Sequence, residues 1–256
     1  LQGYSTDGTG AIENDATRDL LTSLETVDLS KFQRVAKETK TVELNLNLNS
    51  NAIQVGVANH APNITNITVF DSQGNDYLLN LSWTRTAGDA NLWQCTPTLK
   101  NTDPAGAESV AVTPAGVINL EFNTDGTPKA FSTATNGAAV DGAAGNPAIC
   151  ALVFADTAIT GAFGTGREVS TMTINLNIGN FDTSSGVTQY DAPYQTSLLN
   201  QDGNGPTDLE RVSFNDKGLL TAVFSDGSSR PIYKLPIATV PAPAELEALS
   251  GNAYRI

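Results

Sequence analysis

Residues 42–48 read Val-Glu-Leu-Asn-Leu-Asn-Leu, and residues 172–178 read Met-Thr-Ile-Asn-Leu-Asn-Ile. In both stretches apolar residues alternate strictly with polar ones. This period of two places the apolar side chains on one face of a β-strand and the polar side chains on the other. The pattern predicts two half-buried strands that lie side by side and bury one continuous apolar stripe. We expect the chain to enter an inserted domain through the first strand and to leave it through the second.

The segment between these two strands is also rich in strand patterns. Residues 67–70 precede a turn over residues 71–75, and residues 77–83 return as a second strand, since Gly and Asn in the turn supply the positive φ of a tight reversal. Residues 132–148 are small and polar and are predicted to form a long surface loop. Further strand candidates are residues 92–95, 117–122 and 149–154.

The strongest short-range pattern lies near the C-terminal end. Strand candidates at 209–214, 219–224 and 231–240 are separated by the turn sequences Asn-Asp-Lys-Gly and Ser-Asp-Gly, which predicts a three-stranded antiparallel meander. Residues 243–249 contain good helix formers and are followed by Gly251, which predicts a short helix. Residues 16–40 mix helical spacing with Thr and Asp and are interpreted as irregular or extended.

Composition and charge exclude several classes of protein. The 256 residues carry 14 Lys and Arg against 27 Asp and Glu, for a net charge of −13. Nucleic acids and anionic membranes attract basic surfaces, so neither is expected as a partner. No apolar run is long enough to span a bilayer. The chain begins at Leu1 without an initiator Met and is interpreted as a fragment of a longer protein.

A search for catalytic groups nominates no residue. The single histidine, His60, precedes Ala-Pro and is interpreted as a loop residue, and no Gly-x-Ser-x-Gly elbow accompanies it. The Gly-rich stretch 161–166 lacks the strand-then-helix context of a phosphate-binding loop and is interpreted as a loop. No pair of facing carboxylates can be singled out for glycoside hydrolysis. The expectation is that the chain is not an enzyme and has no cofactor.

Three other features have a binding interpretation and a structural one. The acidic turns 71–76 and 202–208 offer oxygen ligands, but neither has the bidentate Glu of a calcium loop, so both are interpreted as turns. Trp83 and Trp93 would suit sugar stacking, but they lie in strand patterns and are expected in the core. Cys95 and Cys150 fit no zinc or redox motif, and the sequence leaves open whether they form a disulfide or stay as buried thiols.

Several segments resemble the bacterial flagellar hook protein family, and the order of these segments is more specific than any one of them. The most distinctive is Ile-Thr-Val-Phe-Asp-Ser-Gln-Gly-Asn at 67–75. The other matching segments are Leu1-Gln-Gly-Tyr4, Glu-Leu-Asn-Leu-Asn-Leu at 43–48, Ser-Gly-Val-Thr-Gln-Tyr at 185–190, Gln-Asp-Gly at 201–203, and the runs 212–229, 236–240 and 246–252.

The resemblance implies an all-β fold of two domains. The first would be discontinuous, over 1–41 and 187–256, and the second would be inserted over 42–186. It also implies a structural subunit that is exported without a cleaved signal peptide. Such a subunit assembles with copies of itself into a flexible, torque-transmitting tube outside the cell, and meets hook cap and junction proteins. The fragment alone is expected to be monomeric. The alternative function is a cell-surface adhesin or a carbohydrate-binding β-sandwich module.

Overall fold

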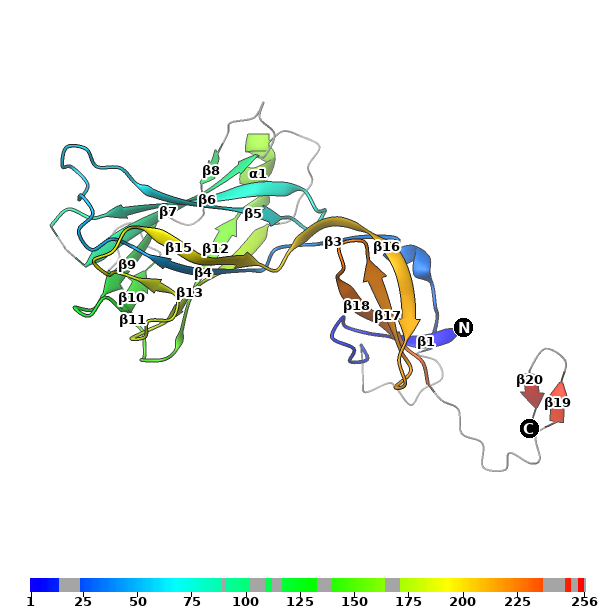
Figure 1. Cartoon of the computed structure of the whole chain (residues 1–256). Coiled ribbons are helices and arrows are strands. Elements are labelled where there is room, and N and C mark those ends of the chain that lie inside the picture. Colours follow the sequence, from blue (N-terminus) through cyan, green and yellow to red (C-terminus); the bar gives the residue numbers. More distant parts are fainter. Residues whose placement is uncertain are drawn as a thin grey trace. The chain divides into compact units, whose positions relative to one another are not determined.

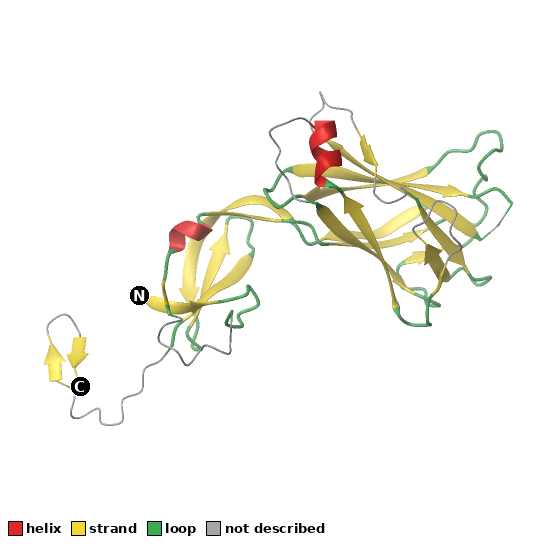
Figure 2. Ribbon diagram, turned by 180° about the vertical axis from the view of Figure 1, so that it is seen from behind, coloured by secondary structure: helices red, strands yellow, loops and turns green. Residues whose placement is uncertain are grey.

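The computed structural model describes residues 1–13, 24–88, 91–101, 109–111, 117–132, 140–163, 171–236, 247–249 and 253–255. Strands dominate these residues, and the helical segments are the α-helix α1 (Asp156–Phe163) and a 3₁₀ helix (Leu29–Phe32) (Figure 2). The predicted all-β fold is confirmed. The chain divides into two compact units: unit 1 comprises residues 1–35 and 207–256, and unit 2 comprises residues 36–206.

Unit 2 contains two sheets. In the described part of the chain the larger one has seven strands in the order β11-β10-β9-β7-β6-β5, with β8 also paired to β7 (Figure 1). The predicted hairpin around residues 71–75 is present, because β5 and β6 pair antiparallel from Asn63 opposite Trp83 to Phe70 opposite Asp76. The strands of this sheet are β5 (Asn63–Phe70), β6 (Asp76–Arg85), β7 (Leu92–Asn101), β8 (Ser109–Ala111), β9 (Ile118–Phe122), β10 (Pro128–Ser132) and β11 (Val140–Asp141).

The second sheet of unit 2 contains the two alternating stretches. The described strands run in the order β12-β13-β4-β14, with β15 also paired to β4. The predicted side-by-side arrangement is confirmed: β13 and β4 pair in parallel, with Leu176 opposite Val42 and Asn177 opposite Glu43. The strands are β4 (Thr41–Asn47), β12 (Pro147–Phe154), β13 (Met172–Asn180), β14 (Val187–Thr188) and β15 (Gln195–Gln201).

One hydrophobic core lies between the two sheets of unit 2. The alternating residues of β4 and β13 point into it, since Val42, Leu44, Leu46 and Leu48 are at most 2% exposed. From the other sheet, Tyr77, Leu79, Leu81 and Trp83 of β6 enter the same cluster, and so do Trp93, Cys95 and Leu99 of β7. Burial of these large side chains is the main term that stabilises the sandwich.

Unit 1 is built on the predicted meander. Its described strands run in the order β2-β1-β18-β17-β16-β3, of which β3 and β16 also include a few residues of unit 2, and β16, β17 and β18 pair antiparallel in sequence. Its smaller core consists of Leu220, Ala222, Phe224, Ile232 and Tyr233. The strands are β1 (Gln2–Ser5), β2 (Glu25–Thr26), β3 (Arg34–Lys37), β16 (Asn204–Phe214), β17 (Leu219–Phe224) and β18 (Ser229–Lys234), with a separate hairpin of β19 (Glu247–Leu249) and β20 (Ala253–Arg255).

The limits of unit 2 differ from the predicted domain boundaries of 41/42 and 186/187. Residues 36–41 and 187–206 belong to unit 2, because β14 and β15 both pair with β4. Leu199 of β15 lies opposite Leu44, and Val187 of β14 lies opposite Leu46. The chain therefore runs on through β14 and β15 after β13 before it returns to unit 1, and β13 is not the strand through which it leaves.

Four local predictions also need correction. Residues 247–249 form strand β19 instead of the end of a helix, because they pair with β20; residues 243–246 lie outside the described part. Within the predicted loop 132–148, residues 140–141 and 147–148 are strand residues, and 133–139 are not described. Residues 161–163 end helix α1 instead of forming a loop, and 164–166 are not described. Strand β18 ends at Lys234, earlier than the predicted 240.

Residues 16–40 were predicted to be irregular or extended, and part of that segment has regular structure. Strand β2, the 3₁₀ helix and strand β3 occupy much of residues 24–37, while 16–23 lie outside the described part. The Asp28 carboxylate begins the 3₁₀ helix by accepting the Ser30 backbone N–H at 2.9 Å. Phe32 at its end packs edge-on against Tyr233, with ring centroids 6.0 Å apart.

Candidate functional site

An uncharged segment runs from residue 44 to residue 70 of unit 2. It lies between Glu43 and Asp71 and contains no Asp, Glu, Lys or Arg, in a chain whose net charge is −13. It includes most of β4, the connection to β5 and all of β5. An uncharged surface on a strongly acidic protein is the part that a second acidic molecule approaches with the least repulsion.

The connection between β4 and β5, residues 48–62, exposes aliphatic side chains and is called the apolar loop below. Ile53 is 45% exposed, Val55 41% and Val57 56%. The loop extends from one end of unit 2 between strands β4 and β5 (Figure 1). Exposed aliphatic side chains that gather on one loop are typical of an interaction surface, whereas single ones scattered over a protein are ordinary.

Contacts with the rest of unit 2 hold the apolar loop in place. The Arg85 guanidinium donates to the Ala52 carbonyl at 3.0 Å, and the Val55 N–H donates to the Arg85 carbonyl at 3.0 Å. The Asn51 amide donates to the Asp191 carboxylate at 2.6 Å. Because these contacts fix the loop at several points, Ile53 and Val57 are presented on an ordered backbone.

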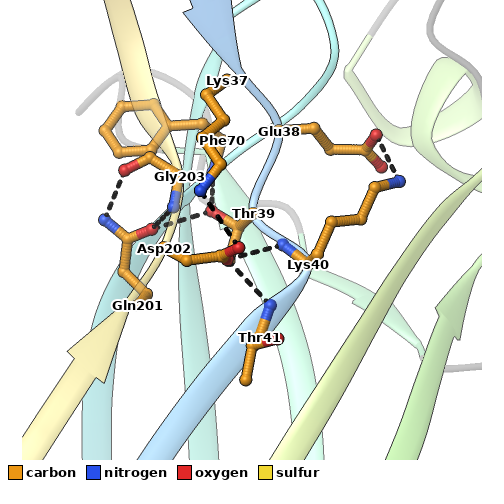
Figure 3. Close-up of polar contacts among 9 residues, drawn as sticks. All are labelled: Lys37, Glu38, Thr39, Lys40, Thr41, Phe70, Gln201, Asp202 and Gly203. Atoms are coloured by element: carbon orange, nitrogen blue, oxygen red, sulfur yellow. Dashed lines mark hydrogen bonds and ion pairs between the residues drawn. The ribbon is translucent and has the colours of Figure 1, made fainter. Parts of the chain in front are cut away.

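A network of polar contacts, the polar clamp, lies just inside unit 2, where the chain has entered it and where it is about to leave (Figure 3). The Thr39 hydroxyl is fully buried, accepts the Phe70 backbone N–H at 2.9 Å and donates to Gln201 Oε1 at 3.0 Å. The Thr39 N–H also donates to the Phe70 carbonyl at 2.9 Å. The clamp comprises Lys37, Thr39, Lys40, Thr41, Phe70, Gln201, Asp202 and Gly203.

Asp202 joins the incoming and outgoing segments within the clamp. One carboxylate oxygen accepts the backbone N–H groups of Lys40 and Thr41, both at 2.8 Å, and the other pairs with Lys37 Nζ at 3.3 Å. Burial raises the pKa of Asp202, but the hydrogen bonds from Thr41 and Lys40 and the charge of Lys37 together outweigh that effect, so its pKa lies below the usual value. The folded state therefore favours the carboxylate form.

Replacing Asp202 with alanine is expected to destabilise unit 2 by about 1 kcal/mol at pH 7, a value reduced for the partial exposure of this carboxylate. Because the pKa is depressed on folding, the contribution is present above about pH 4 and is lost as pH falls through the folded-state pKa. The wild-type and variant stabilities should therefore converge in acid. Urea unfolding followed by tryptophan fluorescence measures this, because both tryptophans, Trp83 and Trp93, lie in unit 2.

Asp76 provides the matched control for that experiment. It is exposed on β6 of the same unit, and Asp76→Ala removes the same charge and the same side-chain atoms. This substitution should change the stability of unit 2 by less than about 0.5 kcal/mol, both at pH 7 and in acid. Equal losses for the two variants would show that net charge, and not the clamp, accounts for the effect.

The residues weighed for chemistry are dispersed over the described part of the chain. His60 is half-buried in the apolar loop, where its backbone N–H donates to the Val57 carbonyl at 3.2 Å. Asp71 is buried and accepts from the Gln73 and Asn75 N–H groups and from Tyr77, as a turn residue does. In the acidic turn 202–208, the Asp202 carboxylate belongs to the clamp, while the Asp208 carboxylate pairs with Arg34.

The binding interpretations of the tryptophans and acidic turns gain no support from their surroundings. Trp83 and Trp93 are each 1% exposed, so the expectation that they belong to the core is confirmed. Over the described ranges no three His, Cys, Asp or Glu side chains lie together as metal ligands would. No helix in the same ranges has the length and apolar character needed to cross a bilayer.

The structure has both cysteines in the reduced form. Cys95 and Cys150 are both buried and both carry free thiols. Burial raises the pKa of Cys150 to about 11, and it raises the pKa of Cys95 well above the usual value. A thiol with such a pKa is protonated and unreactive at neutral pH.

Sequence reasoning missed both the apolar loop and the polar clamp. The apolar loop had a readable signal, which is the absence of charged residues from 44 to 70. The polar clamp had no readable signal in the sequence, since Thr39 and Gln201 are ordinary polar residues far apart in the chain. Only the pairing of β15 with β4 brings them together.

Comparison with known proteins identifies relatives of the chain. The family described as "Flagellar basal body protein FlaE D2 domain" matches residues 45–204, which contain the uncharged segment except for its first residue. The flagellar hook protein FlgE of Rhizobium meliloti is 27% identical over 192 residues, covering 74% of this chain and 38% of that protein. FlgE of Treponema pallidum is 27% identical over 230 residues, covering 86% of this chain and 49% of that protein.

A solved structure is similar at lower identity. The crystal structure of Helicobacter pylori flagellar hook protein FlgE2 matches with a TM-score of 0.42 and 16% identity, covering 75% of this chain and 36% of that one. The chain spans less than half of the length of the two FlgE relatives named above. The family match covers more than half of the chain, and the predicted resemblance is confirmed: the chain belongs to the flagellar hook protein family that carries the FlaE D2 domain.

Proposed function

We propose that this chain is the globular part of a structural subunit of the bacterial flagellar hook, which self-assembles into a flexible helical tube that transmits torque from motor to filament. It acts through contacts with copies of itself and not as an enzyme. Family membership supports the proposal. The observation that carries it is the uncharged segment with its ordered apolar loop, since this is a surface made for contact and not for chemistry.

The charge distribution explains why such a surface would be needed. Two copies of a chain with a net charge of −13 repel each other wherever their acidic faces meet. Residues 44–70 add no charge of their own to that repulsion, and Ile53, Val55 and Val57 among them supply exposed apolar area. Contacts made by a few aliphatic groups amid Asn and Thr are small and wet compared with obligate interfaces. Weak contacts of this kind can break and re-form as a tube bends.

Assembly into a tube is proposed for the full-length subunit and not for this chain alone. The chain corresponds to less than half of its FlgE relatives, so we assign polymerisation to the parent subunit. The parent would be exported without a cleaved signal peptide, would work outside the cell in the flagellum, and would also meet hook cap and junction proteins. The fragment alone should sediment as a monomer, because single contacts of this size are too weak to hold two copies together.

The alternative of an adhesin or carbohydrate-binding module is not favoured. It was motivated by Trp83 and Trp93 as a sugar-stacking surface and by the Asn and Asp turns. Both rings are buried in the core of unit 2, and the Asp71 and Asp202 carboxylates accept backbone N–H groups of the protein itself. A glycan array should therefore show no saturable binding by the fragment.

The proposal is tested by placing a charge on the apolar loop of the full-length subunit. Ile53→Asp should reduce the number of hooks per cell on the order of tenfold, because an unpaired carboxylate would be buried at each contact. Hooks are counted by electron microscopy of a strain that depends on the variant, together with swimming in soft agar. Ile149→Asp is the matched control, since Ile149 on β12 is 46% exposed against 45% for Ile53.

The outcomes separate a contact surface from a folding defect. The two isolated fragments should unfold at similar urea concentrations, because both side chains are about equally exposed. Normal hooks with Ile53→Asp would exclude the apolar loop as a contact. Loss of hooks with both variants would mean that any added charge prevents assembly, and the argument for this particular surface would fail.

A further inference from the structure

Two cysteines share the core of unit 2, and they come from different sheets. Cys95 lies on β7 of the larger sheet and Cys150 on β12 of the other sheet (Figure 1). They are the only cysteines of the chain. Cys95 is 0% exposed and Cys150 is 1% exposed, and both belong to one hydrophobic cluster.

The register of the strands directs both thiols into that core. Cys95 pairs with Trp83 on β6 and with Ile118 on β9, and both of these neighbours are core residues. Cys150 pairs with Leu176 on β13, which is fully buried. Directly paired residues of neighbouring strands point to the same face of a sheet, so each cysteine belongs to the inner face of its own sheet.

The two thiols therefore enter the same core from its two opposite sheets, and the electrostatics of Cys95 agrees with that placement. Burial raises the pKa of Cys95 most, and a negative charge on Cys150 raises it further. Such an interaction is felt only between groups that are close together. Two thiols that enter one core from its two facing sheets have the arrangement from which a covalent tie between the layers of a β-sandwich is made.

We propose that Cys95 and Cys150 form a disulfide that ties the two sheets of unit 2 when the chain folds in the presence of a small-molecule disulfide. The thiolate of one cysteine attacks oxidised glutathione and releases one glutathione thiol. The second cysteine thiolate then attacks the mixed disulfide and releases the other. The S–S bond of glutathione is thereby reduced to two thiols, which take up the two electrons and two protons lost by the cysteines. This modification is independent of the proposed hook function.

The same burial determines when the bond forms. In the folded, reduced protein the thiols are protonated and shielded from solvent, so reagent cannot reach them and exchange is slow. During folding, before the sheets close, both thiols are accessible. The disulfide is thus a product of folding under oxidising conditions and is not readily added to or removed from the finished domain.

The experiment refolds the full 256-residue chain from urea, either in a mixture of reduced and oxidised glutathione or in a reducing agent. After oxidative refolding, titration with a thiol reagent in denaturant should find no free thiol, and peptide mass spectrometry should find Cys95 linked to Cys150. After reductive refolding, the same titration should find two free thiols per chain. The oxidised form should melt about 5–10 °C higher, since the bond closes a loop of about 55 residues.

The controls are Cys95→Ala, Cys150→Ala and the double variant. Each single variant should end as a reduced thiol or a glutathione adduct of the remaining cysteine, and the double variant should melt at one temperature under both conditions. Two free thiols in the oxidatively refolded wild-type chain, or dimers linked between molecules, would overturn the proposal. The wild-type thiol count decides the matter even if an alanine variant fails to fold.

Discussion

Replacing Gly179 with alanine is expected to lower the stability of unit 2 by about 3 kcal/mol or more, enough to leave a marginal domain largely unfolded. Gly179 near the end of β13 has φ of +103°, and Gly186, with φ of +97°, forms an isolated antiparallel bridge with it. A Cβ on Gly179 would collide with the Ser185 carbonyl oxygen. The obstacle is backbone held by the bridge, so it cannot move aside as a flexible side chain can.

Gly145→Ala is the matched control for that substitution. Gly145 also has a positive φ, +79°, but a Cβ there would have no heavy atom within 4 Å. It should therefore cost only the backbone strain, about 1 kcal/mol. Urea unfolding followed by the fluorescence of Trp83 and Trp93 measures both variants in the same unit. Similar losses for the two would mean that strain alone, and not the close approach of Gly179 and Gly186, explains the requirement for glycine.

The parts of the fold that could be predicted are those in which pattern and pairing coincide. The alternation in 42–48 and 172–178 matches the burial of β4 and β13 almost residue for residue. One face of each strand packs into the core and the other does not, so apolar and polar residues must alternate. The hairpin of β5 and β6 and the meander of unit 1 were also readable, because their turns contain Gly at a position of positive φ: Gly74, Gly218 and Gly227.

The strand by which the chain leaves unit 2 could not be predicted in the same way. β15 reads Gln-Thr-Ser-Leu-Leu-Asn-Gln and has no alternation, because none of its residues is fully buried. Its assignment to unit 2 depends on pairing with β4, about 150 residues earlier in the chain. The helix predicted near the end of the chain was wrong for a related reason. Residues 243–249 contain good helix formers, but intrinsic propensity is easily overridden by pairing, and residues 247–249 gain a strand partner in β20.

The candidate site was only partly visible in the sequence. The absence of charge from 44 to 70 can be read directly, but the exposure of Ile53 and Val57 cannot, since isolated aliphatic residues in a sequence are more often buried. The polar clamp depends on Asp202 reaching the backbone of Lys40 and Thr41, a contact that exists only after β4 and β15 are paired. Sequence patterns describe single strands well and contacts between distant strands poorly.

Replacing Trp93 with alanine is expected to destabilise unit 2 by about 3–5 kcal/mol, through lost apolar burial, the cavity left behind and a lost hydrogen bond. The Trp93 side chain is 1% exposed, and its indole N–H donates to Gln189 Oε1 at 3.0 Å. Gln189 follows β14, and its backbone N–H donates to the Gly126 carbonyl at 2.9 Å. The indole thus fills the core and also connects β7 to the segment that follows β14.

A pair of phenylalanine variants separates these contributions, because Trp83 and Trp93 are equally buried but differ in hydrogen bonding. The Trp83 indole nitrogen is buried and has no hydrogen-bond partner in the part of the protein that the structure describes. Trp83→Phe therefore removes side-chain volume together with a buried N–H that makes no hydrogen bond to the described residues. Trp93→Phe removes a similar volume together with the hydrogen bond to Gln189. Trp93→Phe should be the more costly by about 1–2 kcal/mol in urea unfolding followed by circular dichroism. Equal costs would show that the bond to Gln189 adds nothing to stability, and that the core holds both rings by packing alone.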